Sequence, residues 1–167
     1  MKKWVWRLVV VMVLAGLGCW GWRVLFPSPE QVIRKRLNHL ANAACFSGNE
    51  GALVKVAKAQ AITSFCTPDV EITLDIPGYG HHEINGIAEL LQQAAAARSY
   101  REGCNVQFFD IVVNVAPDQN SAIADLTAKG SVLNDKDFNV QELRFKLRKV
   151  EGKWLIYHAE TVHALTP

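Results

Sequence analysis

The segment "LRKVEGKWLIYHAETVHAL", residues 147–165, decides the fold. Apolar and polar residues alternate on both sides of Glu151 and Gly152. A two-residue turn that contains glycine, placed between two such runs, is typical of a β-hairpin. We therefore predict two antiparallel strands, at 138–150 and 153–165.

Two further strands are predicted upstream of this hairpin, at 104–115 and 121–133. The turn-forming segments "APDQN" and "NDKD" join them to each other and to the hairpin. Four strands linked in this way form an antiparallel meander, and strands of this length must twist and bend. The apolar positions change faces between Val140 and Leu143, which predicts a β-bulge there. The sheet is therefore expected to be strongly curved.

Three helices are predicted before the meander. The first begins where Ser28 can cap and Pro29 suits the first helical position, and it ends at Gly48. The second follows Asn49 and ends near Phe65, and the third is capped by Asn85. Apolar positions recur at helical spacing in each: Ile33, Leu37, Leu40, Ala41 and Ala44; then Leu53, Val56, Ala57 with Gln60; then Ile87, Leu90, Leu91, Ala94 and Ala97.

Between the second and third helices, "DVEITLDI" at 69–76 alternates and is rich in branched residues, which predicts a strand. The next segment, "PGYGHHEING" at 77–86, is predicted to be a loop. Helices followed by a meander indicate an α+β domain with the helices on one side of the sheet. We expect an α+β domain in which a strongly curved antiparallel sheet and three helices enclose a hollow.

The first 27 residues are predicted to be a membrane anchor, and residues 28–167 the folded domain. Trp4 and Trp6 precede an apolar run that Trp20 and Trp22 follow, which is typical of two interfacial belts. As a helix, residues 4–26 would extend about 35 Å, enough to span a hydrocarbon core of about 30 Å. The basic amino terminus favours a single-pass inner-membrane protein whose domain is exported to the periplasm.

Two other interpretations of the N-terminal segment remain open. A cleaved signal peptide has a similar basic start and apolar centre, but it ends in small residues, where this chain has Trp20 and Trp22. A lipid attached to Cys19 is the second, although Gly16 stands where that signal has a large aliphatic residue.

Export would permit disulfides among the three cysteines of the domain, Cys45, Cys66 and Cys104. A bond between Cys45 and Cys66 and three buried thiols are equally compatible with the sequence.

Charge and motifs exclude several classes of function. After Pro27 the chain has 14 Lys and Arg against 16 Asp and Glu, which does not favour nucleic-acid binding. The sequence contains no phosphate-binding glycine loop, dinucleotide fingerprint or nucleophile elbow, so no cofactor is predicted.

The order of these elements resembles the nuclear transport factor 2-like superfamily over about residues 29–165. The resemblance is carried by Pro68-Asp69-Val70 in "TPDVEI", Gly86 in "NGIAELL", and Gly152-Lys153-Trp154 with Ile156 in "LRKVEGKWLIYH". It implies a cone-shaped fold that often dimerises through its sheet. The superfamily includes polyketide cyclases, ketosteroid isomerase and scytalone dehydratase, and also members that only bind partners. The anchor and exported domain are also similar in layout to an inner-membrane component of type IV secretion systems.

Three residues are candidates for acid/base chemistry. His158 and Glu160 lie two apart on one predicted strand, so the carboxylate can orient the imidazole. Asp110 stands among apolar residues of the strand 104–115, where burial would favour its neutral form. The plainer interpretation places all three residues on an exposed face.

Further residues are predicted to line the hollow or its mouth: Phe108, Trp154, Tyr157, His81 and His82. The run His81-His82-Glu83 lacks a third ligand at a matching spacing, so no metal site is predicted.

The sequence thus favours a membrane-tethered module that binds a small apolar ligand or assembles with partners. The expected partners are a second copy of the chain, through the sheet, or another envelope protein. The alternative is a small isomerase, dehydratase or cyclase acting on a hydrophobic molecule in the cone.

Overall fold

The structure, a computed structural model, describes residues 27–76, 80–100, 103–132 and 138–162. Its elements follow in the order α2 (Pro29–Ala44), β1 (Phe46–Ser47), α3 (Ala52–Thr63), β2 (Cys66–Ile76), β3 (Gly80–Asn85), α4 (Ile87–Tyr100), β4 (Gly103–Val115), β5 (Ser121–Val132), β6 (Phe138–Val150) and β7 (Lys153–Thr161). Within these ranges no helix is long and apolar enough to cross a membrane. The predicted membrane segment at 4–26 lies outside the described residues.

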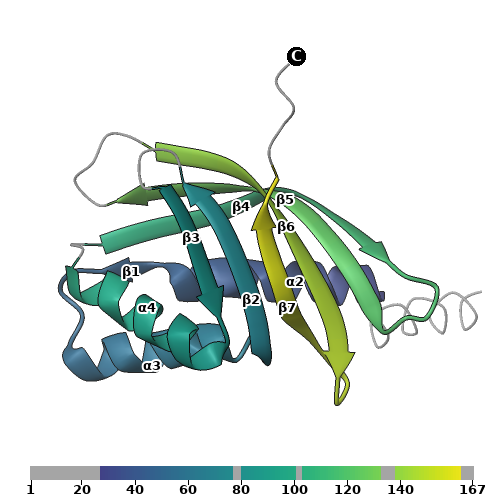
Figure 1. Cartoon of the computed structure of the whole chain (residues 1–167), viewed down its shortest axis with the longest axis horizontal. Helices are drawn as coiled ribbons and strands as arrows, with labels where there is room; N and C mark the ends of the chain where they lie inside the picture. The colour runs from purple at the N-terminus through teal and green to yellow at the C-terminus, as the bar shows by residue number, and fades with distance from the viewer. Residues whose placement is uncertain (1–26, 77–79, 101–102, 133–137, 163–167) are drawn as a thin grey trace, which may run out of the picture.

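The strands form one sheet in the order β1-β4-β5-β6-β7-β2-β3 (Figure 1). The predicted meander is confirmed, because β4 to β7 pair antiparallel in sequence order. The expectation of a wholly antiparallel sheet is wrong, since β2 pairs parallel with β7. Helix α4 carries the chain from β3 at one end of the sheet to β4, leaving the exposed edge of β7 for β2.

The segment predicted as a loop at 77–86 contains a strand. Residues Gly80–Asn85 form β3, which pairs antiparallel with β2 and ends the sheet. Five of its six residues are exposed, so this edge strand has no apolar alternation by which the sequence could reveal it.

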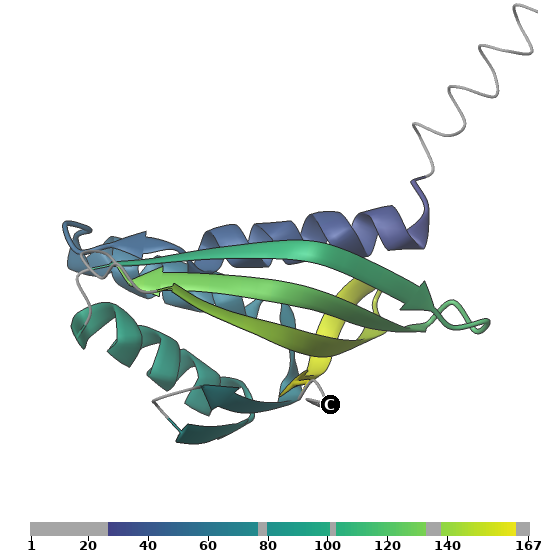
Figure 2. The same ribbon diagram turned by 90° about the horizontal axis from the view of Figure 1, so that it is seen from above.

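Two β-bulges bend the sheet (Figure 2). In β4 the register shifts between Phe109 and Val112, where Asp110 adopts a φ of 50°. In β7, Tyr157 is the extra residue, because Lys146 pairs with His158 and Leu147 with Ile156. The predicted bulge between Val140 and Leu143 is wrong, since β5 and β6 stay in continuous register.

The turn between β6 and β7 is as predicted. Glu151 and Gly152 have φ values of 49° and 79°, the left-handed pair that a type I′ hairpin turn requires.

The hydrophobic core lies between the sheet and the helices. Ile33 and Leu37 of α2 pack with Leu90 of α4 against the sheet residues Leu147 and Trp154. The cap of α2 is as predicted, with the Ser28 hydroxyl accepting from the Gln31 backbone N–H at 3.4 Å. This helix ends at Ala44 rather than Gly48, because Phe46 and Ser47 pair with β4 instead.

Arg98 ties α4 to α2. Its guanidinium is buried, donates to the Ala43 carbonyl at 2.6 Å and lies 5.3 Å from the centre of the Phe46 ring. The last carbonyls of a helix carry partial negative charge, so the contact stabilises the C-terminal end of α2.

Helix α3 presents its apolar stripe outward, contrary to the sequence pattern. Leu53 is 87% exposed and Val56 53%, and Ala57 and Gln60 are also exposed. The buried residue of this helix is Ala59, on the opposite side. A small residue there lets α3 approach α4 and α2 closely, so the longer apolar side chains remain outside.

We expect replacement of Leu37 by Ala to destabilise the domain by about 2–5 kcal/mol, because it leaves a cavity in the core. Leu53→Ala is the matched control and should change the free energy of unfolding by less than about 0.5 kcal/mol, since its side chain already contacts water. Urea unfolding followed by circular dichroism measures both. Equal losses in the two variants would contradict the described packing.

Candidate functional site

The sheet face turned away from the core, here called the outer face, carries rows of charged side chains. These residues alternate along each strand with buried ones, so they point away from the helices. The strand register aligns two rows across β5, β6, β7 and β2: Asp125, Arg144, Glu160 and Thr73, then Ile123, Lys146, His158 and Glu71.

His158 is at the centre of this network. Its Nε2 lies 3.3 Å from Glu160 Oε2, and its Nδ1 lies 3.6 Å from Glu71 Oε2. Lys146 Nζ lies 3.4 Å from Glu160 Oε1. The predicted contact between His158 and Glu160 is therefore present, with 21% of the His158 side chain exposed. His158 therefore lies between two carboxylates, with which it forms ion pairs when its imidazole is protonated.

The environment favours an ionised Glu160. Burial alone would raise the pKa of this carboxyl, but the hydrogen bond with His158 and the nearby Lys146 ammonium outweigh it, so the pKa is lowered. Because two neighbours keep Glu160 ionised, this residue is better suited to form ion pairs than to donate a proton.

The bulge in β7 puts this pair on the face opposite Trp154. The sequence pattern placed Trp154, Ile156, His158 and Glu160 on one face. In the structure Trp154, Ile156 and Ala159 are buried, and the extra residue Tyr157 turns His158 outward.

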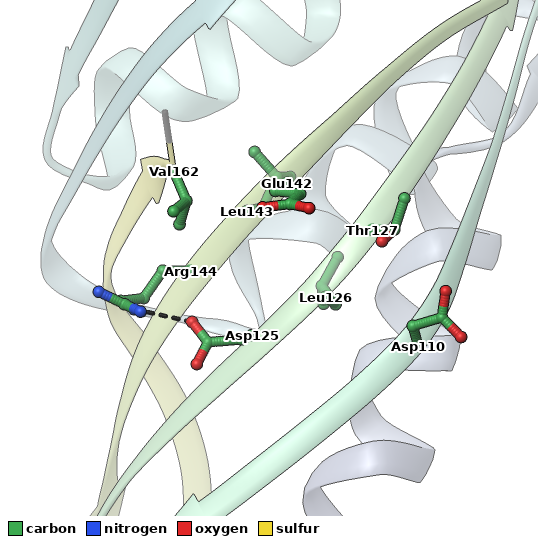
Figure 3. Close-up of a pocket in the computed structure, with 8 residues that line it drawn as sticks. All are labelled: Asp110, Asp125, Leu126, Thr127, Glu142, Leu143, Arg144 and Val162. Carbon is green, nitrogen blue, oxygen red and sulfur yellow. Dashed lines mark hydrogen bonds and ion pairs between the residues drawn. The ribbon is translucent and has the colours of Figure 1, made fainter. Parts of the chain in front are cut away.

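A cavity of about 280 Å³ lies beside these rows. Its lining is Asp110, Asp125, Leu126, Thr127, Glu142, Leu143, Arg144 and Val162 (Figure 3). Arg144 Nε donates to Asp125 Oδ1 at 2.7 Å, and this bond raises the pKa of the guanidinium. The lining holds three carboxylates and one guanidinium, and Arg144 is paired with Asp125, so the cavity favours a cationic group such as a lysine or arginine side chain.

Asp110 lines this cavity and is exposed, as in the plainer interpretation of its position and not in the one that buries its carboxylate. The bulge reverses the faces of β4: Phe108, Ile111 and Val113 pack on the core, whereas Phe109 and Val112 are exposed. Asp110 and His158 also do not meet, because β5 and β6 separate their strands.

The residues predicted to line the hollow lie in three different places. Trp154 is buried in the core, and Phe108 packs on Phe145 with ring centres 5.9 Å apart. The gap between α2 and the Trp154 side chain is too narrow for a water molecule. Tyr157 is half-buried beneath the Arg148 guanidinium, 5.6 Å from the ring centre.

The two predicted rim histidines are exposed on β3. His81 Nδ1 lies 2.8 Å from Asp75 Oδ1 on the neighbouring strand, and His82 pairs with Leu74 in the strand register. No cluster of His, Cys, Asp or Glu in the described ranges has the arrangement of a metal site.

Cys45 and Cys66 are free thiols, so the considered disulfide between them is not formed. Burial raises the pKa of the Cys66 thiol to about 11, and nearby Arg36 offsets this only in part. Cys45 Sγ accepts instead from the Val106 backbone N–H at 3.3 Å. The two residues of the considered disulfide therefore contact different strands.

Apart from Asp110, the residues around the cavity were not predicted from the sequence, and the most important of these are Arg144 and Asp125. The signal was present, because opposite charges at outward positions of adjacent hairpin strands form cross-strand pairs. Using it requires the exact register of β5 and β6.

Comparisons with known proteins identify the fold. No protein-family model matches the chain, and no curated protein matches its sequence. A nuclear transport factor 2-like protein of unknown function from Pseudomonas putida is similar in structure, with a TM-score of 0.62, 14% identity, and coverage of 82% of this chain and 87% of that one. A nuclear transport factor 2-like protein with a cystatin-like fold from Novosphingobium aromaticivorans has a TM-score of 0.58 at 17% identity, covering 89% and 86%. A cystatin-like protein of unknown function from Nostoc punctiforme has a TM-score of 0.59 at 12% identity, covering 78% and 87%.

We expect Glu160→Gln to lower stability at neutral pH by less than about 1 kcal/mol, because the pair is partly exposed. The lowered pKa of Glu160 means that its contribution is present above the ordinary carboxyl value and is lost as pH falls through the folded-state value. The difference between variant and wild type should therefore shrink below about pH 4. Urea unfolding at a series of pH values measures it.

Glu142→Gln is the matched control, since Glu142 is exposed on the same face and makes no ion pair with any described residue. A pH dependence that is the same in both variants would exclude the network as its source.

Proposed function

Because the chain has the nuclear transport factor 2-like fold, we propose that it is a membrane-tethered assembly module whose outer face docks a second copy of itself. The fold alone hosts both enzymes and binding proteins, so the assignment must rest on the chain's own surface.

The observation that carries this proposal is the outer face itself. Its exposed large apolar residues are Phe109, Val112, Ile123, Val140 and Val150. Figure 2 shows β4, β5 and β6 with no helix drawn over the side turned to the viewer. Apolar side chains among charged ones, on a sheet face that the domain does not cover, are typical of a protein interface.

Charge supports a second copy as the partner. The outer face holds cations at Arg144 and Lys146 next to carboxylates at Asp110, Asp125 and Glu142. A two-fold axis presents the same patch on both partners, so a patch of mixed sign can complement itself. The acidic cavity would then receive a cation from the partner. Another envelope protein with a basic, apolar surface is the competing occupant.

The tether rests on the N-terminal sequence. Residues 8–19 are apolar and lie between two tryptophan pairs. Lys2 and Lys3 favour keeping the amino terminus inside. The domain would then lie in the periplasm, held at the inner membrane by one helix.

The enzyme alternative has less support. Its three candidate residues do not converge, since Asp110 lies on β4 and the His158–Glu160 pair lies on β7. All three are outside the helix-covered core in which an apolar substrate would bind. The contact between His158 and Glu160 is the observation that keeps this alternative testable, by assaying the isolated protein against cyclic enones.

We expect Val112→Asp combined with Ile123→Asp to weaken self-association at least about tenfold, because the interface would bury unpaired carboxylates. Light scattering after size-exclusion chromatography of the full chain in detergent measures the change. Val54→Asp, at an exposed valine on α3 and away from the sheet, is the matched control and should leave the dimer intact.

Co-purification of two differently tagged copies from cells distinguishes the partners. Recovery of the second tag supports the dimer, and its absence together with crosslinks to another envelope protein supports that protein instead. A chain that is monomeric at all concentrations and forms no crosslink would refute the proposal that it is an assembly module.

We expect Val11→Arg, in the centre of the anchor, to release the chain from the membrane fraction or to block its insertion. A charge at that depth costs about 2.5–3.5 kcal/mol, whereas Val11→Leu should have no effect. Carbonate extraction of membranes measures retention, and protease added to spheroplasts tests whether the domain is outside. A wild-type chain that is fully soluble after extraction would rule out the tether.

A further inference from the structure

The apolar stripe of α3 is not covered by the domain's own core. Leu53, Val56 and Ala57 follow helical spacing on the exposed side of the helix. Val54 at the border of this stripe is also exposed. Three large aliphatic side chains on one short helix form an apolar patch, here called the α3 patch (Leu53, Val54 and Val56).

The charge around the α3 patch is mainly positive. Helices α2 and α3 together contain five of the 14 Lys and Arg that follow Pro27, but one of the 16 Asp and Glu. The remainder of the domain is acidic, with nine basic against 15 acidic residues. Arg34 and Lys35 are exposed on α2, and α3 itself contains no acidic residue. Lys58 pairs with Glu50, whereas Lys55 forms no ion pair with any residue in the described ranges.

The position of α2 connects this surface to the bilayer. Helix α2 begins at Pro29, three residues beyond the end of the predicted membrane segment at 4–26. Its 16 residues extend about 24 Å, so a domain lying on its helical side would bring α3 to the same surface as the tether. Figure 1 shows α3 and α2 neighbouring each other below the sheet.

We propose that the α3 patch rests on the surface of an anionic lipid bilayer. Leu53 and Val56 would enter the boundary between headgroups and acyl chains, while Lys55, Arg34 and Lys35 would face lipid phosphates. Charge complementarity favours this occupant over a second copy of the chain, because the same basic surface on both partners would repel itself. The inference rests on the proposed tether, and it leaves the outer face pointing away from the membrane.

Hydrogen–deuterium exchange of the full chain in nanodiscs tests the contact. Peptides covering 52–63 should exchange about tenfold more slowly in nanodiscs containing phosphatidylglycerol than in nanodiscs of phosphatidylcholine alone, because burial of one leucine corresponds to about that factor. The double variant Leu53→Ser with Val56→Ser should abolish the difference between the lipids. Arg34→Glu with Lys35→Glu should reduce it by about fivefold or more.

Lys153→Glu is the control for the charge reversal, since Lys153 is exposed at the start of β7 and lies outside both helices, and it should leave the protection of α3 unchanged. Equal exchange in both lipids would overturn the inference. Protection of α3 that rises with protein concentration in neutral lipid would also overturn it, since a protein would then be the occupant. Loss of the chain from nanodiscs on carbonate treatment would instead indicate failure of the tether.

Discussion

Two β-bulges determine which side chains this sheet gives to the core and which to the surface. The extra residues at Asp110 in β4 and Tyr157 in β7 each reverse the alternation of the residues that follow. Without the first, Val112 would point into the core and Ile111 would be exposed. Without the second, His158 would replace Ala159 beside Phe145, and a polar ring would be buried. The apolar interior and the charged outer face therefore depend on the same two insertions.

Sequence reasoning predicted the elements well and their relations less well. Turn residues and alternation located β4 to β7, and capping residues located α2, because those signals are local. The parallel pairing of β2 with β7 is not local, since either free edge of a meander is open to a further strand. Strand β3 was missed because an exposed edge strand needs no apolar face. The contact between His158 and Glu160 was predicted, but the sequence pattern placed the pair on the same face as Trp154. Both faces of this strand contain apolar and polar residues, so the pattern does not reveal the extra residue at Tyr157.

Helix α3 shows the limit of reading burial from composition. An apolar stripe indicates that one side of a helix is buried, but it does not identify the surface that buries it. Here the domain buries Ala59 and leaves Leu53 outside. The acidic sheet and the basic helices then give the domain two unlike sides. Under the proposals above, the outer face would contact a second copy and the α3 patch the bilayer. Two weak contacts on different sides can hold a domain in one orientation, since each restricts a rotation that the other permits.

The pairing of β2 with β7 also has a consequence for biogenesis. β2 follows the second helix, yet the strand beside it is the last one made, so Thr73 finds Glu160 only when synthesis is nearly complete. Contacts between such distant parts of a chain slow folding and prevent a stable partial product. A polypeptide of this topology stays unfolded while it emerges from the ribosome. Under the proposed export, that delay would keep the chain extended for a translocation channel, and folding would be completed beyond the membrane.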